Sequence, residues 1–331
     1  AVDGVSWRIL LEDLETAYHQ LGRGEKIDLP GKTTSYQQWA ESLREYSKSS
    51  QVETELSHWK EQSRSGVRHV PVDFPVGVNT ASARQRVEVT LSEGETRELQ
   101  NEVPRTYQTQ MNDVLLTALG GTLCNWSGGN AVLVDVEGHG REEIIGGVDL
   151  TRTVGWFTSI YPVRLEVVKG EGLGESLRRV KEQMRRIPNR GVGYGVLKYL
   201  SEERVRRELE GREESEVSFN YLGQYHRLAA GSGWGISGER TGSNHSGTAN
   251  RRHLIEIDGF TVGGELRLTW SYSARKHRRE TIEGLARDYL ERLRELMRHC
   301  RSNPIGAYTP SDFPKAKLSQ EELDELLAEL H

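Results

Sequence analysis

Residues 111–143 decide the fold class, and they read MNDVLLTALGGTLCNWSGGNAVLVDVEGHGREE. Apolar residues fill most positions up to Trp126, which predicts a buried helix that ends at the glycine pair 128–129. The run AVLVDV is continuous, apolar and bounded by turn residues, which predicts a buried strand. A buried helix followed directly by a buried strand is typical of an α/β protein.

The flanking sequence continues this alternation of helices and strands. Apolar periodicity predicts helices over 5–21, 35–48, 54–62, 173–186 and 279–300, and a capped helix over 92–104 that Pro104 closes. Strands are predicted over 86–92, 160–168, 216–222 and 265–273. Residues 66–85 lack periodicity and carry Gly and Pro, so we expect a linker between a first unit, 1–65, and a second, 86–315. Residues 316–331 predict a helix that leads out of the domain.

Composition excludes several classes of function. The 331 residues allow two domain-sized units or one extended two-lobed fold. The net charge of -5 gives no basic face for nucleic acid. Cys124 and Cys300 lie far apart in the sequence, which predicts two free buried thiols and neither a disulfide nor a metal site. No apolar run approaches a membrane span and no leader pattern is present, so we expect a soluble cytoplasmic protein with no membrane partner.

Two polar clusters are candidates for chemistry at the ends of predicted elements. Asp3 and Gly4 open the first helix, where an aspartate accepts backbone N–H groups as a simple N-cap or holds an arginine. Glu137 leaves the buried strand beside two glycines, and burial there would raise its pKa toward that of a useful general base. The alternatives are a solvated loop glutamate and, for His139, a structural histidine.

Two further clusters combine aromatic and hydrogen-bonding side chains. Trp156, Phe157, Thr158 and Ser159 would form an apolar wall with hydroxyl donors for a thioester arm, although ordinary core packing explains the two aromatics equally well. Asn220 and Tyr221 lie on a predicted strand and can donate to an oxygen that gains negative charge. A paired strand that ends in a turn at Gly223 is the simpler alternative.

Taken in order, these clusters resemble the signature motifs of epimerization domains of nonribosomal peptide synthetases. The opening VDGVSWRILLEDL is similar to the end of the HHxxxDG motif, and EGHGRE, RTVGWFTSIYPVRLE, PNRGVGYG (which by itself predicts a flexible turn) and FNYLGQ are similar to the next four motifs. TQMNDVLLTAL and LRLTWSYS extend the resemblance over essentially the whole chain. Condensation domains share HHxxxDG but usually lack EGHGRE and FNYLGQ in this form.

The resemblance implies a fold and a set of site residues. The fold is the chloramphenicol-acetyltransferase-like one, two α/β lobes in a V, represented here by the end of the N-terminal lobe and a full C-terminal lobe. Glu137 matches the catalytic glutamate, and Asn220 and Tyr221 match strand residues near the channel. Asp3, Gly4 and Arg141 match structural positions of the active site, and His139 and residues 156–159 match the channel. The histidine pair is expected before Ala1, so the chain is either an excerpt of a longer protein or an inactive truncation.

The activity that the resemblance implies is an isomerase reaction of antibiotic biosynthesis. It inverts Cα, from L to D, in an aminoacyl or peptidyl thioester on the phosphopantetheine arm of an upstream peptidyl carrier protein, with no cofactor of its own. A downstream synthetase is a further expected partner. The arginine-rich segments 178–190 and 204–212 are candidate contacts for an acidic carrier, or else solvated, salt-bridged helix faces. A condensation domain and a noncatalytic carrier-docking module are the alternatives.

Overall fold

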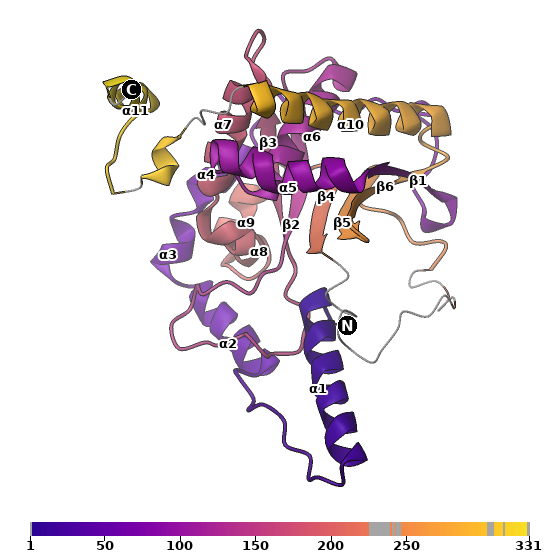
Figure 1. Ribbon diagram of the computed structural model, residues 1–331, viewed down its shortest axis with the longest axis vertical. Helices are drawn as coiled ribbons and strands as arrows, with labels where there is room; N and C mark the ends of the chain where they lie inside the picture. Colours follow the sequence, from indigo (N-terminus) through magenta and orange to yellow (C-terminus); the bar gives the residue numbers. More distant parts are fainter. Residues whose placement is uncertain are drawn as a thin grey trace.

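A mixed six-stranded sheet forms the centre of the upper part of the molecule (Figure 1). The computed structural model describes residues 2–224, 239, 242, 246–302, 308–313 and 315–329. The strands are β1 Arg84–Leu91, β2 Ala131–Gly138, β3 Ser159–Glu166, β4 Val217–Gln224, β5 Ile255–Val262 and β6 Glu265–Ser273. Their order is β1-β6-β5-β4-β2-β3, and β4 runs parallel to both β2 and β5 whereas the other pairs are antiparallel.

The two faces of the sheet differ in chemistry because side chains alternate along each strand. On one face, Val136, Phe219 and Ile257 are buried in register beneath the helices. These helices are α5 Glu93–Tyr107, α6 Met111–Ser127, α7 Leu173–Arg185 and α10 Arg279–Ser302, of which α10 and α5 cross the top of Figure 1. The opposite face carries polar residues on β4 and β5, and this face provides the acidic groups of the site.

The N-terminal helices lie below and beside the sheet. Helices α1 Gly4–Gly22 and α2 Tyr36–Tyr46 form the tapering lower end of the molecule in Figure 1. The short helices α3 Ser50–Glu53 and α4 Leu56–Gln62 pack against α8 Val192–Tyr199, α9 Glu203–Leu209 and the edge strand β3. The fully buried Trp59 of α4 belongs to the same core as the sheet. The boundaries 65, 85 and 315 between the expected units therefore stay predictions.

The predicted linker, 66–85, runs as an irregular chain along the sheet. It contains only the short helical turn η1 Ala81–Ala83 before β1 begins. The Arg68 N–H donates to the carbonyl of Ala131 at 3.1 Å, so this segment is held at the start of β2. At the other end of the chain, α11 Gln320–Glu329 lies at the upper left of Figure 1, with Leu323 buried and Asp324 3.7 Å from Arg178 of α7. Residues 330 and 331 of its predicted span lie outside the described residues.

Most predicted elements are confirmed, but the prediction that Pro104 closes a helix is wrong. Helix α5 begins with the predicted capping box, in which Ser92 and Glu95 bond reciprocally, and continues beyond Pro104 to Tyr107. A proline inside a helix removes one hydrogen bond and crowds the preceding turn. The buried side chains of Val103 and Tyr107 pack on both sides of Pro104, and this packing offsets the loss.

The prediction of a flexible turn at PNRGVGYG is also wrong in part. Residues Pro188–Gly191 form the short helical turn η2, and helix α8 begins at Val192. Two glycines lower the helix propensity of this segment, but Tyr194 and Leu197 are buried and fix the helix by packing. Helix α9 and strand β5 also form where no element was predicted. The alternating pattern of IEIDGFTV, residues 255–262, is a strand signal.

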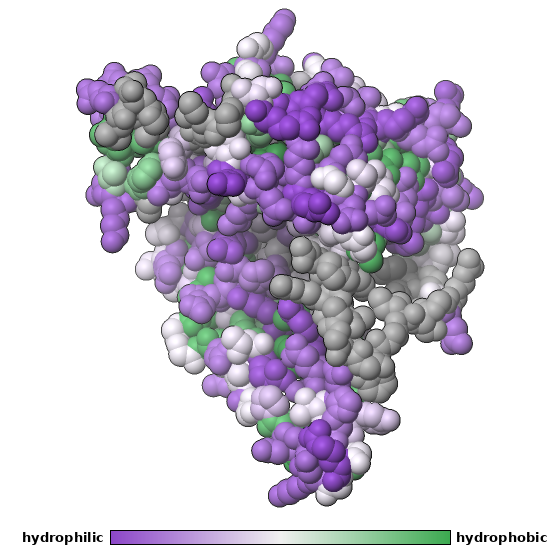
Figure 2. Space-filling model, viewed as in Figure 1, coloured by the Kyte–Doolittle hydropathy of each residue, from purple (hydrophilic) through white to green (hydrophobic). Residues whose placement is uncertain are grey.

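The surface is predominantly hydrophilic. Figure 2 shows a largely hydrophilic face over α5 and α10, with small separate hydrophobic patches. In the part of the chain that the structure describes, no helix has both the length and the hydropathy needed to cross a membrane. Cys124 and Cys300 are free and buried, as predicted.

Candidate active site

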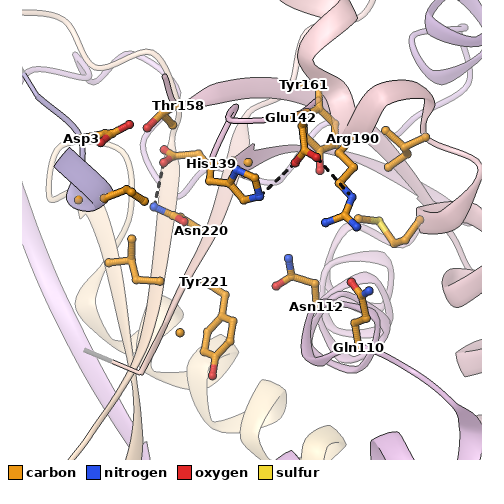
Figure 3. A pocket seen from close by; sticks show the side chains of 18 of the residues that line it. Asp3, Gln110, Asn112, His139, Glu142, Thr158, Tyr161, Arg190, Asn220 and Tyr221 are labelled. Carbon is orange, nitrogen blue, oxygen red and sulfur yellow. Dashed lines mark hydrogen bonds and ion pairs between the residues drawn. The ribbon is translucent and has the colours of Figure 1, made fainter. Parts of the chain in front are cut away.

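A cavity of about 790 Å³ opens where the parallel strands β2 and β4 end (Figure 3). Its walls come from the start of α1, the N-terminus of α6, the ends of β2 and β4, the beginning of β3 and the segment 184–190. The carboxyl ends of neighbouring parallel strands meet at one edge of a sheet, which is where open α/β sheets bind ligands. The sequence motifs around positions 3, 137, 158 and 220 therefore converge on one space.

Glu137 is the acidic group at the end of β2, and its environment favours the protonated form. Burial raises the pKa of Glu137 to about 7, and the carboxylates of Asp258 and Glu256 add to the rise, whereas His253 opposes it. The amide of Asn220 donates to Glu137 Oε2 at 2.8 Å (Figure 3). A carboxyl group with a pKa near 7 can both take and give a proton at neutral pH.

Asn220 and Tyr221 both line the cavity but point to opposite faces of β4. This follows from the alternation of side chains along a strand. Asn220 points to Glu137, while the Tyr221 hydroxyl lies 3.4 Å from Thr261 Oγ1 and its ring packs against the core. Figure 3 shows the Tyr221 side chain pointing away from the Asn220 amide.

Asp3 caps α1 and also holds Arg141. Asp3 Oδ1 accepts the Ser6 N–H at 2.7 Å and lies 3.1 Å from Arg141 Nη2, and both side chains are buried. Burial alone would raise the pKa of Asp3, but the hydrogen bonds from Ser6 and Arg141 and the arginine charge outweigh it and lower the pKa. The Arg141 guanidinium also donates to the carbonyls of Leu150 and Thr153. This network fixes the start of α1 to the loop after β2.

Of the four predicted channel residues at 156–159, only Thr158 lines the cavity. Phe157 is buried in a small cluster with Trp39 and Leu150, and its ring lies 4.0 Å from the Arg141 guanidinium carbon. Trp156 is half exposed, and Ser159 Oγ is buried with no hydrogen-bond partner among the described residues. The predicted aromatic wall is thus not part of this cavity, because alternate side chains of the segment point into the core.

His139 lines the cavity within a chain of charged groups. His139 Nε2 lies 3.1 Å from Glu142 Oε1, and Glu142 Oε2 lies 3.7 Å from Arg190 Nε, as the dashed lines in Figure 3 show. His139 Nδ1 accepts the N–H of Arg141 at 3.0 Å. Both nitrogens of His139 are therefore engaged. Glu142 is a cavity residue that the sequence did not single out, and Arg190 was predicted only as part of the carrier-contact segment 178–190.

The turn that carries Arg190 has an unusual backbone. Asn189, Arg190 and Gly191 have φ values of 45°, 48° and 87°, a left-handed conformation that costs energy for the first two residues. The Asn189 amide donates to Glu55 Oε1 at 2.6 Å, and Glu55 is itself buried at the start of α4 with a pKa that burial raises. A Cβ on Gly191 would lie 1.9 Å from the Tyr161 ring, so only glycine fits there. These contacts hold Arg190 at the cavity rim.

The N-terminus of α6 provides a second acidic group. Asp113 is buried, its Oδ2 accepts the Gln110 N–H at 2.7 Å, and burial raises its pKa to about 6 against the opposing effects of that bond and of Arg185 and Lys181. Gln110, Asn112 and Asp113 all line the cavity. The QMND sequence is a capping box in the structure, and this signal, a polar residue followed three positions later by Asp, was present in the sequence.

Comparisons with known proteins agree with this arrangement. Residues 1–319 match the Condensation domain family. A linear gramicidin synthase of Brevibacillus parabrevis is 48% identical over 327 residues, which cover 98% of this chain and 4% of that protein. Tyrocidine synthase 1 of the same organism is 37% identical, with 98% and 31% covered. The chain thus spans less than a third of the length of these two curated relatives.

Solved structures confirm the predicted fold. The epimerization domain from the third module of tyrocidine synthetase B superposes with a TM-score of 0.83 at 36% identity, covering 92% of this chain and 68% of that one. The first condensation domain of the CDA synthetase superposes with a TM-score of 0.65 at 18% identity, covering 89% and 62%, which supports the fold alone. The predicted α/β, chloramphenicol-acetyltransferase-like fold is therefore correct. The chain belongs to the condensation-domain family of nonribosomal peptide synthetases.

Proposed function

We propose that this chain forms the active-site cleft of an epimerization domain, which inverts Cα of an aminoacyl or peptidyl thioester. The observation that carries the proposal is Glu137, a half-buried carboxyl group with a pKa of about 7 in the cavity that Asp3 and Gly4 also line. Similarity to the tyrocidine synthetase B epimerization domain supports the same assignment. The similarity to gramicidin and tyrocidine synthases agrees with a place in antibiotic biosynthesis.

The proposed reaction needs two acid/base groups on opposite faces of Cα. A thioester makes the Cα–H more acidic than an amide does, and removal of this proton gives an enolate whose oxygen must be stabilised. Glu137 is the group on one face, and the second histidine of an HHxxxDG motif before Ala1 is the group on the other. Asp3 and Gly4, which match the end of that motif, line the cavity, and this supports the proposal.

Asn220 and Tyr221 have different proposed roles. Asn220 donates to Glu137 and so orients the carboxyl group toward the cavity. Tyr221 remains the proposed donor to the enolate oxygen, which requires its hydroxyl to leave the 3.4 Å contact with Thr261 when substrate is bound. Asp3 and Arg141 hold the wall that carries the motif, and His139 and Thr158 line the substrate channel.

The substrate arrives on a partner protein, and the chain needs no resident cofactor for this chemistry. We propose that an upstream peptidyl carrier protein supplies the phosphopantetheine arm in the cytoplasm, with a downstream synthetase as a further partner. Most arginines of segments 178–190 and 204–212 are paired within the chain, for example Arg185 with Asp312 and Arg204 with Glu53. Arg186 and Arg190 are also paired, but at the longer distances of 3.8 and 3.7 Å, and their side chains are 75% and 69% exposed. Arg190 also lines the cavity, so these two are the stronger candidates for carrier contact.

A single loaded carrier distinguishes this proposal from the condensation alternative. The intact synthetase module that contains this chain is incubated with one aminoacyl carrier protein in deuterated water, with no acceptor. Epimerization predicts deuterium at Cα and a mixture of L and D residues after hydrolysis of the thioester. A condensation domain, or a noncatalytic docking module, leaves Cα unlabelled and the residue in its L form.

A further inference from the structure

Three polar side chains, those of Glu137, Asn220 and Asp258, lie in one row across the sheet, and the first two line the cavity. Asn220 of β4 is the register partner of Asp258 of β5, and on its other side it bonds to Glu137 of β2. The row continues through Thr269 of β6 to Glu88 of β1. Side chains at such positions lie on one face of the sheet, about 4.8 Å apart from strand to strand. Glu137 and Asp258 therefore flank the amide of Asn220.

Glu137 and Asp258 differ in their charge partners from Asp135 and Glu256, the acidic residues two positions earlier on the same strands. Glu256 lies 3.0 Å from Arg251 and 3.5 Å from Arg84, and Asp135 lies 2.8 Å from His253 and 3.3 Å from Arg252. Within the part of the chain that the structure describes, neither Glu137 nor Asp258 forms an ion pair with a basic side chain. Arg84, Arg251, Arg252 and His253 thus pair with Glu256 and Asp135, and Glu137 and Asp258 are left without an ion-pair partner among the described residues.

We propose that Asp258 is a positioning residue for Glu137. The negative charge of Asp258, acting across Asn220, adds to the effect of burial and makes Glu137 easier to protonate. The inference rests on the proposed function, in which Glu137 must give a proton as readily as it takes one. It assigns to Asp258 no contact with the substrate. The raised pKa of both groups agrees with this arrangement: burial and then Asp258 raise that of Glu137, and burial and then Glu256 raise that of Asp258.

The neighbouring charges and the distance between the two carboxyl groups determine how far Asp258 raises the proton affinity of Glu137. The groups that face the pair are Asp135 on β2, Glu256 on β5, Arg84 and Arg86 on β1, and His253 before β5. Glu137 and Asp258 are two strand spacings apart, about 9.5 Å between backbones. At an effective dielectric constant of about 20, removal of one charge at that distance lowers the proton affinity of Glu137 about tenfold. This corresponds to a fall of about one pH unit in its titration.

The test is Asp258→Asn, which keeps the shape of the side chain and removes the charge. The unfolding free energy of the intact protein is measured as a function of pH with Glu137 and with Glu137→Gln. The difference between the two values is obtained once with Asp258 present and once with Asp258→Asn. The pH at which the difference levels off should fall by about one unit in Asp258→Asn, because only the folded-state pKa of Glu137 changes, and should stay near the wild-type value in Asp258→Glu. Glu88→Gln, at the far end of the same row and exposed, is the matched control for loss of one charge.

The pH profile of Cα deuterium exchange is the second readout. Its Glu137-dependent limb should move to lower pH by the same amount in Asp258→Asn, with Asp258→Glu restoring the wild-type profile. If neither the levelling-off pH nor the limb moves in a folded Asp258→Asn variant, the inference is overturned. Wild-type exchange in Glu137→Gln overturns the proposed function instead, whatever the levelling-off pH does, so the two failures are distinguishable.

Discussion

Replacement of Glu137 by glutamine should stabilise the fold at neutral pH, although it removes the proposed catalytic group. The folded-state pKa of about 7 lies above the ordinary value of 4.5. Between these two values the folded protein binds more protons than the unfolded chain, so its stability falls as the pH rises. The difference corresponds to about 3 kcal/mol once the group is fully ionised. Glutamine carries no charge and its carbonyl oxygen can still accept the Asn220 N–H.

The gain in unfolding free energy of Glu137→Gln should therefore be near zero below pH 4.5, rise between pH 4.5 and about 7, and level off above that. Urea denaturation at a fixed ionic strength, followed by tryptophan fluorescence at about pH 5, 6, 7 and 8, measures it, provided that the slope against urea is unchanged. Glu143→Gln, an exposed glutamate of the same loop, controls for the loss of one charge. A Glu137→Gln difference that is flat over this range refutes the claim that burial holds a proton on Glu137.

Two further predictions concern the wall of the cavity and the carrier. Arg141→Ala leaves Asp3 buried without its partner and should lower the unfolding free energy by about 3–5 kcal/mol. The control, Arg152→Ala, removes a more exposed ion pair between α1 and the same loop and should lower it by about 1 kcal/mol or less. Equal losses in the two variants, measured by urea denaturation, contradict the structural role of the buried pair. Arg186→Glu should weaken the binding of an acidic carrier protein, measured by calorimetry at two salt concentrations. Arg207→Glu, on helix α9, is the control and should leave the affinity unchanged. Unchanged affinity in Arg186→Glu removes that residue from the proposed contact.

Local patterns in the sequence predicted the main elements because each has a strong apolar period or a cap. Residues 111–138 form a buried helix and a buried strand, as their composition indicates. The errors occur where tertiary packing overrides a local signal. Pro104 sits inside α5 because Val103 and Tyr107 are buried around it, and the glycine-rich residues 192–195 are helical because Tyr194 faces the core.

The candidate site was predictable only where one residue carries its own signal. Glu137 leaves a buried strand beside glycines, and Asp3 opens a helix, so both were identified from their positions. Asp258, and the place of Arg190 at the cavity, were missed because they depend on tertiary relations that no local pattern contains. The register of β4 against β5 places Asp258 beside Asn220, and the left-handed turn at 189–191 places Arg190 at the cavity.

Cα deuterium exchange on a carrier-bound aminoacyl thioester tests the role of Glu137 most directly. The measurement uses the intact synthetase module, with wild-type Glu137 and with Glu137→Gln, at neutral pH and with equal amounts of folded protein. Loss of one acid/base group predicts that exchange falls by about 10²- to 10⁴-fold in Glu137→Gln, while Glu143→Gln exchanges as the wild type does. Exchange at the wild-type rate in Glu137→Gln contradicts the account.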